Sequence, residues 1–165
     1  MPDHTIDKQQ LHDILLTALQ ALVENARNAM LRAYETATHE ENIAENKYDT
    51  LGLEAAYLTQ GQARRLAECE ADLLAFQNLT PRTFSATDTI NVGAVVQLED
   101  ETGQVNFFYL GPAAGGLKIT CAGQDMVVIT PSSPLGKALL HRKVGDDVML
   151  PVANRKKHYE VIALH

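Results

Sequence analysis

The first half of the chain carries two long stripes of apolar residues at helical spacing. Members recur every three or four positions, which places them on one face of a helix. The first stripe is Leu11, Leu15, Ala18, Leu22, Ala26, Ala29 and Ala33, and the second is Leu51, Ala55, Leu58, Gln62, Leu66, Cys69, Leu73 and Phe76. Pro81 disfavours helix at Thr80. The pattern therefore predicts two long helices, the second ending before Leu79.

A short polar segment joins these helices, which is typical of an antiparallel helical hairpin. Alanine at many seam positions allows the two helices to approach closely. Helices of roughly 30 residues would make an arm about 45 Å long. The alternative is two helices folded onto a compact core, and the alternation of polar and apolar faces does not decide between them. We take residues 1–79 as a coiled-coil arm.

Beyond a threonine-rich linker at residues 80–89, the hydrophobic period changes from helical to strand-like. Strands are predicted at 92–98, 105–110, 117–121, 126–130, 148–152 and 158–164. Ser133 is a natural N-cap and Pro134 fits the first position of a short helix. Residues 90–165 are therefore predicted to form a small sheet domain with one short helix, which makes the whole chain α+β.

Composition narrows the function classes. The net charge is −7, and the acidity lies in the first half, where 13 residues are acidic and 6 are basic. Residues 81–165 hold 8 of each kind, and no basic stripe suited to duplex DNA is visible. The chain has no tryptophan and few aromatic residues, which disfavours an aromatic-lined pocket and base-stacking modules.

The two cysteines, Cys69 and Cys121, fall in different predicted elements and have no metal-ligand spacing, so we expect buried reduced thiols. The N-terminus is polar and unlike a secretory signal. Apolar runs are too short to span a bilayer. We therefore expect a soluble cytoplasmic protein that has no membrane partner and is a monomer.

Carboxylates gather in the turn between the predicted helices. Glu40, Glu41 and Glu45 lie within six residues together with Asn42. One interpretation is a solvated acidic turn. The other is a set of ligands for a divalent cation, since hard cations prefer oxygen ligands. Two or three carboxylates alone would hold Mg²⁺ weakly, so such a site would work best if a partner supplied part of the coordination shell.

Several motifs resemble one known family over nearly the whole chain. Glu45-Asn46 is followed without gaps by Glu54 and Gly61, and Gly111-Pro112 follows a strand. The most specific stretch is Ser133-Pro-Leu-Gly-Lys-Ala-Leu-Leu140, followed by Lys143-Val-Gly-Asp146. In order and spacing these residues resemble the bacterial Gre transcript-cleavage and elongation factors, GreA and GreB.

The resemblance implies a coiled-coil hairpin followed by an FKBP-like sheet domain. The sheet domain would dock at the rim of the RNA polymerase secondary channel through Ser132, Ser133 and Pro134. At the hairpin tip, Glu45 and Glu41, with Asn42, would help the polymerase hold its second Mg²⁺. The polymerase would then cut the 3′ end of backtracked nascent RNA. On this view the chain is not itself an enzyme and binds no cofactor alone.

One departure from the family pattern concerns the tip. Asn42 stands where the family has an aspartate, and it offers a neutral carbonyl oxygen without charge. His141 also stands where glycine is common. Three functions remain open: a cleavage cofactor, a channel-binding regulator or inhibitor without cleavage, and a prolyl isomerase or chaperone.

The third function is the weakest, because fold does not give function. An isomerase pocket needs converging aromatic side chains, and the C-terminal half offers only Phe84, Phe107, Phe108, Tyr109 and Tyr159. Three of these are consecutive, so they must divide between the two faces of a strand. We expect no useful isomerase activity.

Overall fold

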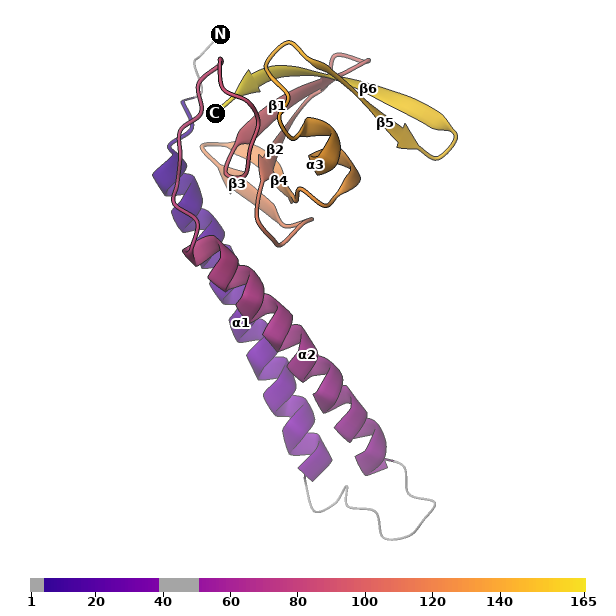
Figure 1. The fold of residues 1–165 in the computed structure, drawn as a ribbon. Coiled ribbons are helices and arrows are strands. Elements are labelled where there is room, and N and C mark those ends of the chain that lie inside the picture. The colour runs from indigo at the N-terminus through magenta and orange to yellow at the C-terminus, as the bar shows by residue number, and fades with distance from the viewer. Residues whose placement is uncertain (1–4, 39–50) are drawn as a thin grey trace. The chain divides into compact units, whose positions relative to one another are not determined.

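The computed structural model describes residues 5–38 and 51–165 (Figure 1). Two long helices, α1 (Lys8–Thr38) and α2 (Leu51–Gln77), precede a sheet that carries one short helix. The remaining elements are β1 (Val95–Asp100), β2 (Val105–Leu110), β3 (Lys118–Cys121), β4 (Gln124–Ile129), α3 (Pro134–Leu139), β5 (Asp147–Val152) and β6 (Arg155–Leu164). The predicted α+β class, with a helical hairpin followed by a sheet with one short helix, is confirmed.

The chain divides into two compact units, and the division cuts through both long helices. The hairpin unit is Leu16–Leu74, and the sheet unit combines the residues up to Leu15 with Ala75–His165. The predicted boundaries at residues 79 and 90 follow the ends of secondary structure. Packing instead groups the start of α1 and the end of α2 with the sheet.

In the hairpin unit, α1 and α2 lie side by side and bury a narrow seam (Figure 1). Its buried residues are Val23, Ala26 and Cys69, with Leu22, Leu66 and Leu73 packed against them. The Arg27 guanidinium bridges the helices, 3.6 Å from Glu70 and 2.9 Å from Glu24 on its own helix. All three side chains are exposed, so this network adds little stability beyond that of the apolar seam.

The predicted seam is wrong in detail. Ala18 and Ala29 are only half-buried, whereas Leu19 and Val23 are buried. On α2, Leu58 is 55% exposed and Thr59 is the more buried neighbour. An α-helix has about 3.6 residues per turn, so the face that meets a partner drifts along the sequence. At Ala18, Ala29 and Leu58 the stripe chosen by apolar character therefore lies beside the buried face, although Ala26 and Ala33 of the same stripe are buried.

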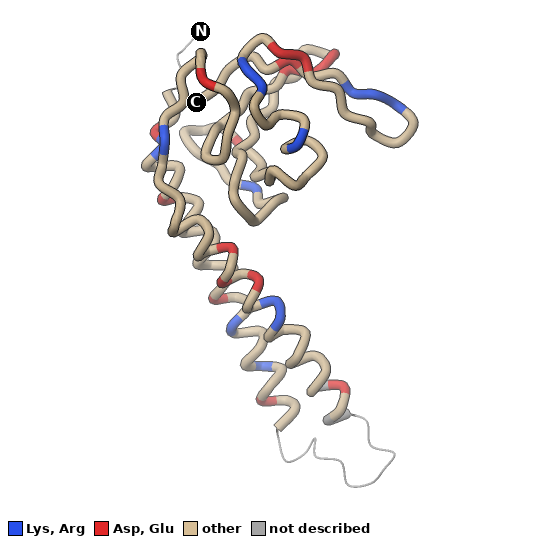
Figure 2. The backbone as a smooth tube through the Cα atoms, in the orientation of Figure 1, with Lys and Arg blue, Asp and Glu red and all other residues tan. Residues whose placement is uncertain are grey.

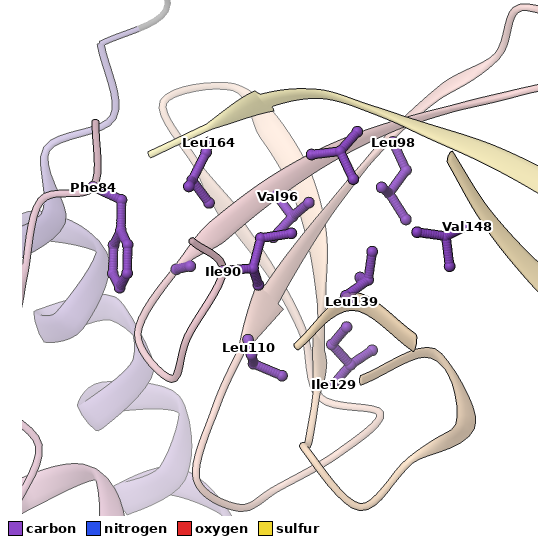
Figure 3. Close-up of a cluster of buried hydrophobic side chains, with 11 residues drawn as sticks. Phe84, Ile90, Val96, Leu98, Leu110, Ile129, Leu139, Val148 and Leu164 are labelled. Carbon is purple, nitrogen blue, oxygen red and sulfur yellow. The ribbon is translucent and has the colours of Figure 1, made fainter. Parts of the chain in front are cut away.

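The sheet has six strands in the order β3-β4-β2-β1-β6-β5. β2 and β4 are parallel, and the other neighbours are antiparallel. Alternate residues point to opposite faces. On one face, Val96, Leu98, Leu110 and Ile129 pack with Leu139 of α3 (Figure 3). This cluster is the main core of the sheet unit.

The opposite face of the sheet meets the helix ends that belong to the same unit. The ring of Phe76, at the end of α2, stacks on Tyr109 of β2 with 6.1 Å between centroids. A Cβ atom at Gly111 would lie 2.8 Å from the Phe76 ring and 2.9 Å from Val128. Only glycine at this position lets Phe76 reach the sheet. The packing of Phe76 on the sheet therefore explains the glycine of the Gly111-Pro112 motif.

Lys8, in the first turn of α1, is buried against the same face. Its ammonium donates hydrogen bonds to the backbone carbonyls of Gly93 and His165, the latter at 3.1 Å. The nitrogen also lies 5.1 Å from the ring centroid of Phe84 and 5.9 Å from that of Tyr109. Burial, and next the positive charge of Arg82, lower the pKa of Lys8 from 10.5 to about 8. A lysine in an amphipathic helix ordinarily lies in solvent, so this role could not be predicted from the sequence pattern.

Lys8 should make the stability of the protein depend on pH. Because the folded-state pKa of Lys8 lies near 8 and its unfolded value near 10.5, the unfolded chain binds more protons between these limits. The free energy of unfolding of the unmodified protein should therefore rise with pH through this window, relative to that of Lys8→Met. Urea titrations across the window would measure this, with the exposed Lys118→Met as the control. If the free energy of unfolding changes with pH in parallel for the unmodified protein and Lys8→Met, Lys8 is not the source of the pH dependence.

Candidate functional site

The loop that enters α3 is held by Ser133. Its hydroxyl donates a hydrogen bond to the Thr130 carbonyl at 2.7 Å and accepts one from the Gly136 backbone N–H at 3.1 Å. Pro134 occupies the start of the helix, where a missing N–H costs nothing. Both hydrogen-bonding capacities of the Ser133 hydroxyl are therefore used inside the loop. The predicted N-cap is confirmed.

Gly136 allows the chain to turn back on β4. A Cβ atom at this position would lie 1.8 Å from the carbonyl oxygen of Thr130 and 2.7 Å from its carbonyl carbon. No side chain fits there without a shift of the backbone. The Ser133-to-Gly136 motif is therefore first a structural device that fixes the return from β4 to α3.

Ser132 and Pro134 are the exposed members of this loop, whereas Ser133 is half-buried. The Ser132 hydroxyl lies 3.1 Å from the Thr130 hydroxyl, a contact that leaves its side chain at the surface. The structure brings the three predicted binding residues together. It leaves Ser132 and Pro134 accessible to a partner and commits Ser133 to the loop itself.

The other predicted site residues, Glu41, Asn42 and Glu45, lie outside the described residues. In the part of the chain that the structure does describe, no group of three or more His, Cys, Asp or Glu side chains is placed to hold a metal ion. No helix within that part is long and apolar enough to cross a membrane. The predicted magnesium ligands therefore remain a prediction from the sequence.

The aromatic residues of the sheet unit do not converge on one cavity. Phe107 and Phe108 line a surface pocket of about 440 Å³ over β2, β3 and β4. Phe84 and Tyr109 flank Lys8, and Tyr159 lies 5.8 Å from the Lys157 nitrogen. Burial raises the pKa of Tyr109 to about 12, so its hydroxyl stays protonated at neutral pH. These rings serve packing at separate places.

Both cysteines are buried with free thiols, as predicted. Burial, and next the carboxylate of Asp7, raise the pKa of the Cys121 thiol. A buried thiol with a raised pKa is a poor nucleophile. The cysteines therefore belong to the packing of the two units.

A helical hairpin followed by a six-stranded mixed sheet with one short helix defines the class of protein. Residues 85–165 match the family described as transcription elongation factor GreA/GreB, C-terminal part. The transcription elongation factor GreA of Acidiphilium cryptum is 31% identical over 148 residues, covering 88% of this chain and 87% of that protein. The chain belongs to the GreA/GreB family of transcription elongation factors.

A second group of similar proteins is named as transcription inhibitors. The transcription inhibitor protein Gfh1 of Thermus aquaticus is 32% identical over 124 residues, which cover 72% of each chain. The crystal structure of Thermus aquaticus Gfh1 aligns with a TM-score of 0.39 and 26% identity, covering 90% of this chain and 92% of that one. Relatives named as elongation factors and as inhibitors thus both resemble this sequence.

Replacing Gly136 by alanine should strongly destabilise the sheet unit. The added methyl group would overlap the Thr130 carbonyl, and overpacking of this severity costs at least about 3 kcal/mol. Gly115→Ala is a matched control, because its Cβ would meet the Thr130 side chain at an ordinary 3.4 Å and should cost less than about 1 kcal/mol. Denaturant unfolding followed by near-ultraviolet circular dichroism would report the tyrosines of the sheet. If Gly136→Ala and Gly115→Ala lose equal amounts of unfolding free energy, the close contact with the Thr130 carbonyl is not what requires glycine at position 136.

Proposed function

We propose that this protein binds RNA polymerase through its sheet unit and places the hairpin tip in the secondary channel. The observation that carries the proposal is the exposed pair Ser132 and Pro134, held on a rigid loop within the stretch that matches the GreA/GreB family. A loop with its polar groups satisfied internally can meet a partner without losing much conformational entropy. The exposed pair would then supply the docking contacts.

At the tip, Glu45 and Glu41 are the charged oxygen donors, and Asn42 adds a neutral one. This donor set suits a hard divalent cation that a partner already holds in part. The Mg²⁺ shared with the polymerase would activate a water for phosphodiester hydrolysis. The role of this chain is to bring carboxylates to that ion and to the 3′ end of backtracked RNA. The bonds would be broken by the polymerase, so the chain acts as a cofactor of that enzyme.

The second candidate function is occupancy of the channel without cleavage. Asn42 favours it, because the tip loses a negative charge at the position where the Gre family carries an aspartate. The similarity to relatives named as transcription inhibitors favours it too. Such a factor would bind the polymerase through the same loop but would hold the second metal too weakly to support hydrolysis. Binding and cleavage must therefore be measured separately.

The double substitution Ser132→Lys with Pro134→Ala should weaken binding to RNA polymerase about tenfold, or roughly 1.4 kcal/mol. It changes the exposed residues of the loop and leaves the Ser133 cap and Gly136 in place. Ser85→Lys with Pro112→Ala makes the same changes at exposed positions outside the loop and should bind normally. Affinity can be measured with labelled protein and core polymerase. Unchanged binding by the loop variant would rule out this docking surface.

Cleavage of backtracked RNA should respond to charge at position 42. A carboxylate near a divalent ion adds Coulomb attraction that an amide lacks, and a net gain of about 1.4 kcal/mol in the transition state raises the rate tenfold. Asn42→Asp should therefore increase cleavage, most clearly at low Mg²⁺. Glu45→Ala should abolish whatever cleavage the unmodified protein supports, without loss of binding.

The matched control is Asn46→Asp, which adds the same charge next to Glu45 at a position that the family pattern does not assign to the metal. Rates measured over a Mg²⁺ series for all three variants decide between the two functions. If Asn42→Asp brings no gain at any Mg²⁺ concentration while binding is intact, the tip is not a metal site in this protein.

A further inference from the structure

The sheet has two edge strands, β3 and β5 (Figure 1). An edge strand presents unpaired backbone N–H and C=O groups, and proline is one of the residues that prevent another chain from pairing there. On β5, the Val161 N–H of β6 donates to the Asp146 carbonyl at 3.0 Å, so alternate residues from Asp146 onwards face β6. Pro151 falls at a position that faces outward. Because it has no N–H to donate, this edge cannot complete a ladder with an added strand.

The edge at β3 has no proline. The Val128 N–H of β4 donates to the Leu117 carbonyl at 2.8 Å, so Leu117 faces β4. In the regular register that follows, Lys118 and Thr120 turn their backbone groups outward. Both residues are exposed. We call the outward N–H and C=O groups of Lys118 and Thr120 the open edge, and their spacing matches that of alternate residues in an extended chain.

A pocket of about 440 Å³ lies beside the open edge, and its lining includes Lys118 and Thr120. Val127 lies opposite Lys118 and beside Phe108 of β2, so all three share the face of the sheet that carries α3. Phe108 packs against the core of that face and is half-buried, as is Val127. These two side chains give the pocket an apolar floor. A pocket next to an open edge suits a side chain of a strand that pairs with this edge.

Lys118 determines the charge at this edge. From Val105 to Pro131 only Lys118 and Asp125 are charged, and this part of the sheet is mostly tan in Figure 2. The Asp125 carboxylate accepts a hydrogen bond from the Thr120 hydroxyl at 2.6 Å. Lys118 forms no ion pair with another residue in the described part of the chain. An acidic residue directly opposite Lys118 on an added strand would therefore gain cross-strand attraction.

We propose that β3 binds an extended peptide segment of a partner protein, which adds a strand to the edge of the sheet. The peptide backbone pairs with the open edge and supplies affinity, while side chains supply specificity. An acidic residue lies opposite Lys118, and a large apolar residue opposite Thr120 reaches into the pocket. The added strand runs antiparallel to β3, so the apolar residue precedes the acidic one by two positions. This role goes beyond polymerase docking, because β3 and the Ser132–Pro134 loop are different surfaces.

A second copy of this chain fits the open edge less well than a peptide. Two β3 strands could pair over at most the 4 residues of Lys118–Cys121. Specific, stable interfaces between proteins bury at least about 1,200 Å², far more than such a pairing covers. β3 also contains no acidic residue, so a second copy lacks the complement to Lys118. A peptide needs no large interface and can carry both the acid and the apolar residue.

The test is an NMR titration of the isotope-labelled full chain with a capped pentapeptide. Its second residue is phenylalanine, its fourth is glutamate and the others are threonine. Binding should shift the backbone amide signals of Lys118 and Thr120 most. Replacing the phenylalanine by alanine, or methylating the backbone nitrogens of the phenylalanine and the glutamate, should weaken binding about tenfold. Methylating the central threonine is the matched control, because its N–H faces away from β3, and it should bind normally.

Variants of the protein test the same contact from the other side. Thr120→Pro removes an outward N–H at a position where an edge strand tolerates proline, as β5 does at Pro151, so it should fold and lose the peptide. Lys118→Glu should weaken binding about fivefold, or roughly 1 kcal/mol, and should prefer a peptide with lysine in place of the glutamate. Lys143→Glu makes the same charge change at an exposed position outside β3 and should bind normally. Thermal unfolding would check that the variants are folded.

Several results would overturn the proposal. These are no binding of the peptide at millimolar concentration, undiminished binding by folded Thr120→Pro, or an equal loss in Lys118→Glu and Lys143→Glu, which would mean that only net charge matters. A dimer of the unmodified protein in sedimentation experiments that Thr120→Pro dissociates would assign the edge to a second copy instead. Because polymerase is absent, each of these failures leaves the docking proposal untouched.

Discussion

The carbonyl oxygen of Thr130 occupies the space that a side chain at position 136 would need, and much of the sheet unit follows from this contact. Because residue 136 is glycine, the chain can return sharply from β4, and the Ser133 hydroxyl can close the turn at both ends. The turn delivers Leu139 to the core beneath α3. It also leaves Ser132 and Pro134 at the surface, where a partner can reach them. A packing requirement and the proposed docking surface thus share the same few residues.

The other face of the sheet depends on a different kind of contact. Lys8 brings a desolvated cation to two carbonyl oxygens and two aromatic rings. Burial of such a charge is costly unless it is fully hydrogen-bonded, which explains why its pKa is lowered even with these partners. Phe76 completes the same face through the space that Gly111 leaves open. These contacts make the start of α1 and the end of α2 part of the sheet unit.

Elements that depend on local pattern were predictable from sequence. Alternation located the strands, and Ser133 with Pro134 located the start of α3. Features that depend on distant contacts were not: Lys8 is a solvated residue by pattern, and Leu58 fits the apolar stripe although Thr59 is the more buried. Two further positions could be seen in the sequence only as parts of a family motif. The reason for glycine at position 136 is the nearby Thr130 carbonyl, which only the structure shows.

His141 has a φ of 68°, in the left-handed region, which explains why glycine is common there.

We propose that one molecule reaches the polymerase with two separate parts, the loop at Ser132 and the tip at Glu45. Site-specific photo-crosslinking in a complex with transcribing polymerase tests it most directly. A photoreactive residue at position 132 should crosslink to the outer rim of the secondary channel, and one at position 45 should crosslink beside the catalytic magnesium. Crosslinks from position 45 confined to the outer surface of the polymerase, or none from position 132, would contradict the account.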